Sequence, residues 1–241
     1  MSQDIYSEGE YLEKHPTWHR EDSAWKANHI SKVLTANSVQ VKSLLEIGCG
    51  AGKILQELKH ALSDSASITG IEISPQAYDM AIRDNPGSIE FIHGSFESLN
   101  PNSPFDVVMM IDVFEHVEDY YGFLKEAKKF GKKFVFHIPL DLSVQTVLRT
   151  APLGRKRKNL GHIHYFNKIT AIQTLEHSGY KVIDHFYTSS YTDLTQKSFG
   201  SKVMKYPRKF LFSLMPEFTV RILGGYSLMV LAEKFESSND F

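Results

Sequence analysis

Residues 44–55 combine an acidic side chain with a cluster of glycines, and this combination could bind a small ligand. An apolar run ends in Glu46, and three glycines follow at positions 48, 50 and 52 before a helical pattern begins. Glycine tolerates a positive φ and lets a ligand approach the backbone more closely than a Cβ atom would permit. We therefore expect a strand that leads into a ligand-binding turn at the start of a helix.

The spacing of these glycines argues against two common phosphate-binding motifs. A dinucleotide fingerprint requires G-x-G-x-x-G, whereas the third glycine here arrives one residue early and Lys53 occupies the expected place. A phosphate loop requires a hydroxyl side chain after its lysine, but Ile54 follows Lys53. The remaining pattern, E-x-G-x-G-x-G, resembles the first motif of class I S-adenosylmethionine-dependent methyltransferases. The plain alternative is an ordinary glycine turn of an α/β sheet.

The resemblance covers about residues 40–190 and the final strand, and it implies a set of cofactor-binding residues. Residues 68–74 have the pattern of a second strand with Glu72 near its end, 24 residues after Gly48. An acid at an offset of about 20 residues can accept hydrogen bonds from a ribose diol. Residues 89–96 resemble the segment whose loop borders the adenine, although Ser95 replaces the usual aspartate. The resemblance implies that S-adenosylmethionine contacts Glu46, Gly48, Cys49, Gly50, Gly52, Glu72, Ile73, Ser95, Phe96, Asp112 and Val113.

Histidines near the expected carboxyl ends of the strands are candidates for removing a proton from the acceptor. Methyl transfer to oxygen requires in-line approach and loss of that proton, and histidine titrates near neutral pH. Residues 105–117 resemble a central strand that opens onto an E-H-V triplet, which many ubiquinone-biosynthesis methyltransferases carry beside the transferable methyl group. Of His116, His137, His162 and His164, we predict His116 as the catalytic base first and His164 second.

A metal-assisted variant is an alternative. Small-RNA 2′-O-methyltransferases hold a divalent metal with E-x-x-E-H and a later histidine two residues before a phenylalanine. Residues 112–116 and His164 to Phe166 are similar to that arrangement, with aspartate in place of the first glutamate. Such ligands suit Mg²⁺ or Mn²⁺. The E-H-V triplet is also common in relatives that bind no metal, so we assign no metal ligand. A non-catalytic cofactor-binding protein is a further alternative, because a fold does not guarantee chemistry.

The elements that would position these residues alternate along the chain between strand and helix patterns, as in a parallel sheet covered on both faces. Besides the segments above, we expect helices at 120–130 and 169–178 and strands at 133–139, 180–187 and 227–232. The resemblance implies a Rossmann-like three-layer α/β sandwich whose seven-stranded, mostly parallel sheet takes its last strand antiparallel. We expect residues 1–241 to form a single methyltransferase domain.

The composition is that of a soluble globular protein. The chain has 241 residues, 42% of them hydrophobic, and a net charge of -1, which suffices for a sizeable core. No run approaches the roughly 18 apolar residues of a membrane helix, and the N-terminus is polar, so we expect a cytoplasmic protein. The single cysteine, Cys49, cannot form an internal disulfide and suggests a small packing residue.

Three segments outside the common sheet are expected to select the acceptor. Residues 1–40 are rich in aromatic residues and would form either an N-terminal lid or a helix on the sheet. Residues 140–167 and 188–225 are long, basic connections that we interpret as substrate-side insertions. Two basic runs in a near-neutral protein suggest a small anionic acceptor, such as a sugar or nucleotide-sugar.

The same basic runs bear on larger partners. A pI of about 6.8 lacks the basic surplus expected of a nucleic-acid-binding protein. Residues 205–215 mix basic and large apolar side chains, which suits peripheral contact with a membrane. The polar and apolar faces of that segment are poorly separated in sequence, so we favour the small-molecule acceptor. The sequence assigns no oligomeric state.

Overall fold

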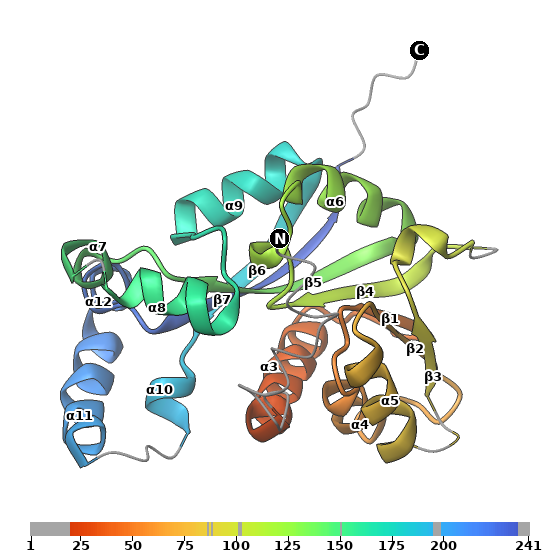
Figure 1. Cartoon of the computed structure of the whole chain (residues 1–241), viewed down its shortest axis with the longest axis horizontal. Helices are drawn as coiled ribbons and strands as arrows, with labels where there is room; N and C mark the ends of the chain where they lie inside the picture. The colour runs from red at the N-terminus through yellow and green to blue at the C-terminus, as the bar shows by residue number, and fades with distance from the viewer. Residues whose placement is uncertain are drawn as a thin grey trace.

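The computed structural model describes residues 20–85, 87, 89–100, 103–149, 151–194 and 199–235. Within these ranges, seven strands form one sheet in the order β3-β2-β1-β4-β5-β7-β6 (Figure 1). The strands are β1 Ser43–Ile47, β2 Ser67–Glu72, β3 Glu90–His93, β4 Phe105–Ile111, β5 Gly131–Leu140, β6 Tyr180–Thr188 and β7 Tyr226–Lys234. The predicted strands are therefore confirmed, with boundaries shifted by a few residues.

The sheet is parallel except at its last strand. Strands β1 to β5 pair in parallel, whereas β7 lies between β5 and β6 and is antiparallel to both. The predicted antiparallel insertion of the final strand is thus confirmed. Because the parallel strands point the same way, the loops that follow β1, β2 and β4 meet at one edge of the sheet.

Helices cover both faces of the sheet and complete three layers. Helices α3, α4 and α5 lie on one face, and α6 and α9 lie on the other (Figure 1). Successive strand residues alternate between the two cores, so that Leu44 packs with the α3 side and Leu45 with the α6 side, as the period of a strand requires. These helices are α3 Ser23–Ala36, α4 Lys53–Lys59, α5 Pro75–Asp84, α6 Tyr120–Ala127 and α9 Lys168–His177.

Local sequence signals explain where several of these helices begin and end. The Ser74 side chain caps α5, and Pro75 occupies its first turn, where the missing amide hydrogen is not needed. Asn167 and Thr170 form a reciprocal capping box at the start of α9. The helix expected at 120–130 ends at Ala127 and continues as a 3-10 turn, Lys128–Phe130.

The N-terminal segment contains a helix packed on the sheet. Residues 1–19 lie outside the described residues, but α3 buries six side chains at helical spacing: Ser23, Lys26, Ala27, Ile30, Val33 and Leu34. Within this segment, Ser23–Ala36 thus form a helix that packs on the sheet. A lysine among the buried positions is unusual, and its partner lies in the site described below.

The two basic connections contain helices, not only the loops that their length suggested. Residues 140–167 hold α7 Val144–Arg149 and α8 Ala151–Leu160, and residues 188–225 hold α10 Ser190–Asp193, α11 Phe199–Leu214 and α12 Pro216–Leu223. Figure 1 shows α7, α8, α11 and α12 gathered at one end of the molecule. No helix among the described residues combines the length and the apolar character needed to cross a membrane.

Candidate functional site

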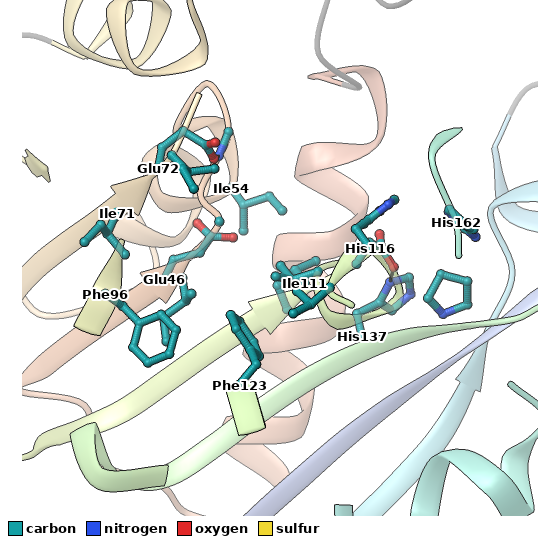
Figure 2. Close-up of a pocket in the computed structure, with 18 of the residues that line it drawn as sticks. Glu46, Ile54, Ile71, Glu72, Phe96, Ile111, His116, Phe123, His137 and His162 are labelled. Atoms are coloured by element: carbon teal, nitrogen blue, oxygen red, sulfur yellow. Dashed lines mark hydrogen bonds and ion pairs between the residues drawn. The ribbon is translucent and has the colours of Figure 1, made fainter. Parts of the chain in front are cut away.

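A cavity of about 990 Å³ lies where strands β1, β2 and β4 end. Its wall contains the last residues of these strands and the loops that follow them, and α3 and α8 contribute further residues. Of the eleven predicted cofactor residues, nine line this cavity: Glu46, Gly48, Gly50, Glu72, Ile73, Ser95, Phe96, Asp112 and Val113. Figure 2 shows Glu46 and Glu72 toward one end of the cavity and His116, His137 and His162 toward the other.

The glycine turn is fixed to strand β2 and to the Glu72 carboxylate. The amides of Gly48 and Cys49 donate to the Ile71 carbonyl, at 2.9 and 3.1 Å. The Gly50 amide donates to Glu72 Oε2 and the Ser74 amide donates to Oε1, each at 2.8 Å. Each carboxylate oxygen keeps acceptor capacity for a ligand hydroxyl.

The other two predicted cofactor residues, Cys49 and Gly52, shape the turn without lining the cavity. Gly52 has a φ of 71°, and a Cβ atom built there would lie 2.5 Å from the Phe91 ring. The Cys49 thiol is buried against Gly70, where an added Cβ would meet Sγ at 2.8 Å. Burial raises the pKa of this thiol well above its usual value, so Cys49 acts as a packing residue.

Glu46 presents a buried carboxyl group to the cavity. Its side chain is 1% exposed, and Oε2 has no hydrogen-bond partner among the described residues. Burial raises the pKa of Glu46 to about 8, with Lys26 opposing the rise and Glu72 adding to it. Glu46 is therefore largely protonated at neutral pH, and a cationic ligand group would favour its ionised form.

Asp112, whose side chain is 25% exposed, is the centre of an ionic network that ties α3 to the end of β4. Its Oδ2 lies 2.9 Å from Lys26 Nζ, and its Oδ1 lies 2.7 Å from His137 Nδ1. Burial opposes ionisation of Asp112, but His137 and Lys26 outweigh it and hold its pKa well below the usual range. The backbone of Asp112 has a positive φ of 56°, which is uncommon for a residue other than glycine.

The Lys26 and His137 side chains both have bonded partners in this network. Burial opposes the charge on Lys26, yet Asp112 and Asp22 raise its pKa above the ordinary value. His137 Nε2 lies 2.8 Å from Thr188 Oγ1, so both ring nitrogens have protein partners. His137 lines the cavity. Because both of its ring nitrogens already have partners, it is less suited than His116 or His162 to take a proton from a substrate hydroxyl.

His116 and His162 lie side by side in the cavity wall, with ring centroids 4.9 Å apart. Burial and the nearby His162 lower the pKa of His116 to about 4. His162 Nδ1 lies 2.6 Å from Asp141 Oδ2, and Asp141 also pairs with Lys156. Burial opposes ionisation of Asp141, but His162 and Lys156 lower its pKa. A carboxylate at Nδ1 leaves Nε2 of the neutral ring as the proton acceptor.

His164, the second predicted base, is placed elsewhere. It does not line the cavity. Its ring centroid lies 4.5 Å from that of Tyr120, and its Nε2 is buried without a hydrogen-bond partner among the described residues. Its amide and that of Ile163 donate to the Glu115 carbonyl. The structure therefore places His116, the first predicted base, beside His162 and not beside His164, the second predicted base.

The described residues that could hold a metal ion differ from those of the metal-assisted alternative. Ligand atoms of Glu115, His116 and His162 lie within 4.8 Å of one another, whereas Asp112 is engaged by Lys26 and His137. Both oxygens of the buried Glu115 carboxyl lack hydrogen-bond partners among the described residues, and burial raises its pKa well above normal. One carboxylate and two imidazoles fit a borderline ion such as Zn²⁺ better than the Mg²⁺ or Mn²⁺ of our sequence analysis.

Sequence reasoning missed Lys26, Asp141 and Thr188. Lys26 could have been predicted from sequence. It falls on the same face of the helical pattern as Ala27 and Ile30, and a lysine on a buried face needs a charged partner. Asp141 follows the end of β5, so it lies at the functional edge of the sheet. Thr188 had no local signal, because only the pairing of β6 with β7 brings it to His137.

Comparisons with known proteins agree with this geometry. A family model described as a methyltransferase domain matches residues 17–185. The mitochondrial ubiquinone biosynthesis O-methyltransferase of Schizosaccharomyces pombe is 40% identical over 136 residues, covering 49% of this chain and 48% of that protein. The ubiquinone biosynthesis O-methyltransferase of Pelagibacter ubique is 33% identical over 93 residues, covering 37% and 38%. The chain thus spans half or less of the length of these relatives.

Solved structures share the fold at low sequence identity. Magnesium protoporphyrin IX methyltransferase from Synechocystis PCC 6803, with bound S-adenosylhomocysteine, aligns with a TM-score of 0.59 at 15% identity, over 88% of this chain and 83% of that one. An S-adenosylmethionine-dependent methyltransferase from Thiobacillus denitrificans, in complex with S-adenosylhomocysteine, aligns with a TM-score of 0.57 at 13% identity, over 94% and 97%. The predicted Rossmann-like fold is therefore confirmed.

Proposed function

The chain belongs to the methyltransferase domain family of class I, S-adenosylmethionine-dependent enzymes, and on that premise we propose that it methylates a hydroxyl group of a small acceptor. One observation carries the proposal. A single cavity joins the glycine turn and two buried carboxyl groups, Glu46 and Glu72, to a pair of histidines, His116 and His162. The first group suits the cofactor, and the second suits removal of a proton from the acceptor.

The cofactor end of the cavity offers a partner for each polar part of S-adenosylmethionine. We assign the methionine part to Glu46 and the glycine turn, and the ribose hydroxyls to Glu72. Phe96 and Ser95 would border the adenine. When bound, S-adenosylmethionine supplies an electrophilic methyl group on a sulfonium centre and leaves as a neutral thioether.

Binding of S-adenosylmethionine at pH 7 is expected to release about one proton from Glu46. Without ligand, the Glu46 carboxyl group has a pKa of about 8, so it is mostly protonated at pH 7. The ammonium group of the bound ligand would stabilise the ionised carboxylate. Affinity should therefore rise as pH increases from about 6 toward about 8.

Calorimetry in two buffers of different ionisation enthalpy measures the number of protons released on binding. The proton count should fall to near zero in Glu46→Gln, whereas Glu57→Gln, at a side chain that is 31% exposed and pairs with Lys53 on α4, should behave like the parent. Equal heats in both buffers for the parent would contradict the assignment.

At the other end, we propose His162 as the general base and Asp141 as the residue that orients it. The Asp141 carboxylate accepts from Nδ1 of His162, which directs Nε2 to take the acceptor proton. The neutral ring of His116, which hydrogen-bonds to the Gly161 backbone, lies beside His162 and bounds the space that the acceptor oxygen would enter. Their part in the reaction is to aim the oxygen at the methyl carbon and to receive its proton as the new bond forms.

The names of the relatives guide the choice of acceptor. Both curated relatives above are O-methyltransferases of ubiquinone biosynthesis, so we favour a hydroxyl on an aromatic ring over a sugar or nucleotide-sugar. An acidic group on that ring stays part of the proposal, because Lys156 lines the cavity. The metal-assisted RNA alternative is not favoured, because Asp112 and His164 do not join the histidine cluster. A cytoplasmic location stays a prediction from sequence.

Binding and turnover can be tested in sequence. Calorimetry with S-adenosylmethionine and S-adenosylhomocysteine should show saturable binding, and no binding at about millimolar ligand would contradict the function. Transfer of a labelled methyl group should then be assayed with aromatic hydroxy acids and with sugar phosphates, with and without a chelator. Transfer to the aromatic hydroxyl in the presence of chelator is expected. Binding without transfer to any acceptor would favour a non-catalytic role, and chelator sensitivity would favour a metal at Glu115, His116 and His162.

A further inference from the structure

Helix α11 exposes a stripe of large apolar side chains. Tyr206, Phe210 and Leu214 are spaced four residues apart and are 75%, 67% and 63% exposed. This spacing puts all three on one side of the helix. Met215 and Phe218, each about half exposed, extend the apolar surface into α12. Single exposed apolar residues are ordinary, whereas a continuous group of this size marks a contact surface.

The opposite side of α11 is packed against the rest of the protein. Phe212 stacks on Tyr226 of β7 with ring centroids 5.0 Å apart. The Arg208 guanidinium donates to the Gly224 carbonyl and lies over the Tyr226 ring. The mixture of basic and apolar residues that looked poorly separated in sequence is therefore resolved, because Arg208 and Phe212 face inward and the stripe faces outward.

Helix α7 adds apolar side chains at the same end of the molecule. Val144, Val147 and Leu148 are exposed, Leu148 at 79%. Helix α7 contacts α12, and α12 contacts α11, so the three helices form one assembly (Figure 1). We name the exposed large apolar residues of α7, α11 and α12, together with Met215 between the last two helices, the outer surface: Val144, Val147, Leu148, Tyr206, Phe210, Leu214, Met215 and Phe218.

The outer surface lies in the most basic part of the chain. Residues 144–160 contain five basic residues and no acidic one, and residues 199–223 contain five basic residues and a single acid, Glu217. The whole chain has a net charge of -1, so positive charge is concentrated at this end. Arg157, Lys158 and Lys209 are exposed, and Lys209 borders the stripe on α11.

We propose that the outer surface binds the face of an anionic lipid bilayer. Basic residues are attracted to acidic headgroups, and exposed aromatic and aliphatic side chains insert at the headgroup boundary. A second copy of the chain is a poorer occupant, because pairing two such surfaces would bring like charges together. Helices α11 and α12 lie beyond residues 17–185, which match the family model, whereas α7 lies within them. Binding to a bilayer is a role beyond the proposed methyl transfer.

The geometry also relates this surface to the cavity. Lys156 and Leu160 of α8 line the cavity, and α8 contacts α7. A bilayer against the outer surface would therefore lie near the acceptor end of the cavity, and not near α4 and α5 (Figure 1). An acceptor held in that bilayer would have a short path to the histidines.

Vesicle co-sedimentation tests the proposal directly. The parent protein should sediment with vesicles of phosphatidylcholine mixed with phosphatidylglycerol, remain in solution with phosphatidylcholine alone, and lose binding as salt rises. The triple variant Tyr206→Ser, Phe210→Ser, Leu214→Ser should bind at least about tenfold more weakly, as should Lys158→Glu with Lys209→Glu. Matched controls on α5, Ile82→Ser and Arg83→Glu, replace comparably exposed residues and should bind like the parent.

Three results would overturn the proposal. They are no sedimentation with anionic vesicles, parent-like binding by the triple variant, and a parent dimer that the triple variant converts to monomer in light scattering. The last result would assign the surface to a second copy. Circular dichroism and S-adenosylmethionine calorimetry on each variant report folding and the cofactor site separately, so failure here leaves the proposed methyl transfer untouched.

Discussion

Replacement of His162 by alanine is expected to lower kcat by about 10³-fold while S-adenosylmethionine affinity changes little. His162 is the ring whose Nδ1 is held by a buried carboxylate, at 2.6 Å from Asp141, and whose remaining nitrogen is available to the cavity. Loss of the base removes proton transfer but leaves the glycine turn and its carboxyl groups intact. Steady-state assays with the acceptor found in the methyl-transfer screen, together with calorimetry, separate the two effects.

Two further substitutions sharpen this test. Asp141→Asn should reduce kcat by about 10-fold to 100-fold with KM nearly unchanged, because the ring loses its orientation but remains present. His164→Ala is the matched control, since His164 lies close in sequence but does not line the cavity. A large loss of kcat in His164→Ala together with normal turnover in His162→Ala would reverse the assignment and favour His164, the second base predicted from sequence.

The fold was accessible from sequence because its signals are local. Apolar runs that end in Glu46 and Glu72, and the glycines between them, mark strand, turn and helix within short windows. Residues 1–40 were ambiguous for a physical reason. A helix such as α3 can pack on the sheet and contribute to the site at once, as Lys26 does, so lid and helix were not exclusive descriptions.

The residues at the glycine-turn end of the cavity were largely predictable, and those at the histidine end were not. Glu46, the glycine turn and Glu72 follow a fixed spacing, and the structure places them along one cavity. The choice between His162 and His164 depends instead on how the chain between α8 and α9 crosses the end of the sheet. That path is fixed by bonds from the Ile163 and His164 amides to the Glu115 carbonyl, a contact between distant residues that no local pattern encodes.

Replacement of Lys26 by methionine is expected to lower the free energy of unfolding by about 3 kcal/mol. The change keeps most of the length of the side chain but leaves the partly buried Asp112 carboxylate with His137 as its side-chain partner among the described residues. The Asp112 side chain is 25% exposed and lines the cavity, so loss of Lys26 leaves its charge without a cationic partner and only partly solvated. Chemical denaturation measures the difference, with Lys32→Met on the exposed side of α3 as the control, expected within about 1 kcal/mol of the parent.

A double variant distinguishes electrostatics from packing at this position. Lys26→Met combined with Asp112→Asn removes both charges, so it should be more stable than the sum of the single changes predicts. If Lys26→Met were as stable as the parent, the ionic network would not hold α3 to the sheet. If the double variant were no better than additive, the loss would come from packing. Because Asp112 also lines the cavity, a coupling between the two residues would make the cofactor site and the N-terminal helix parts of one cooperative unit.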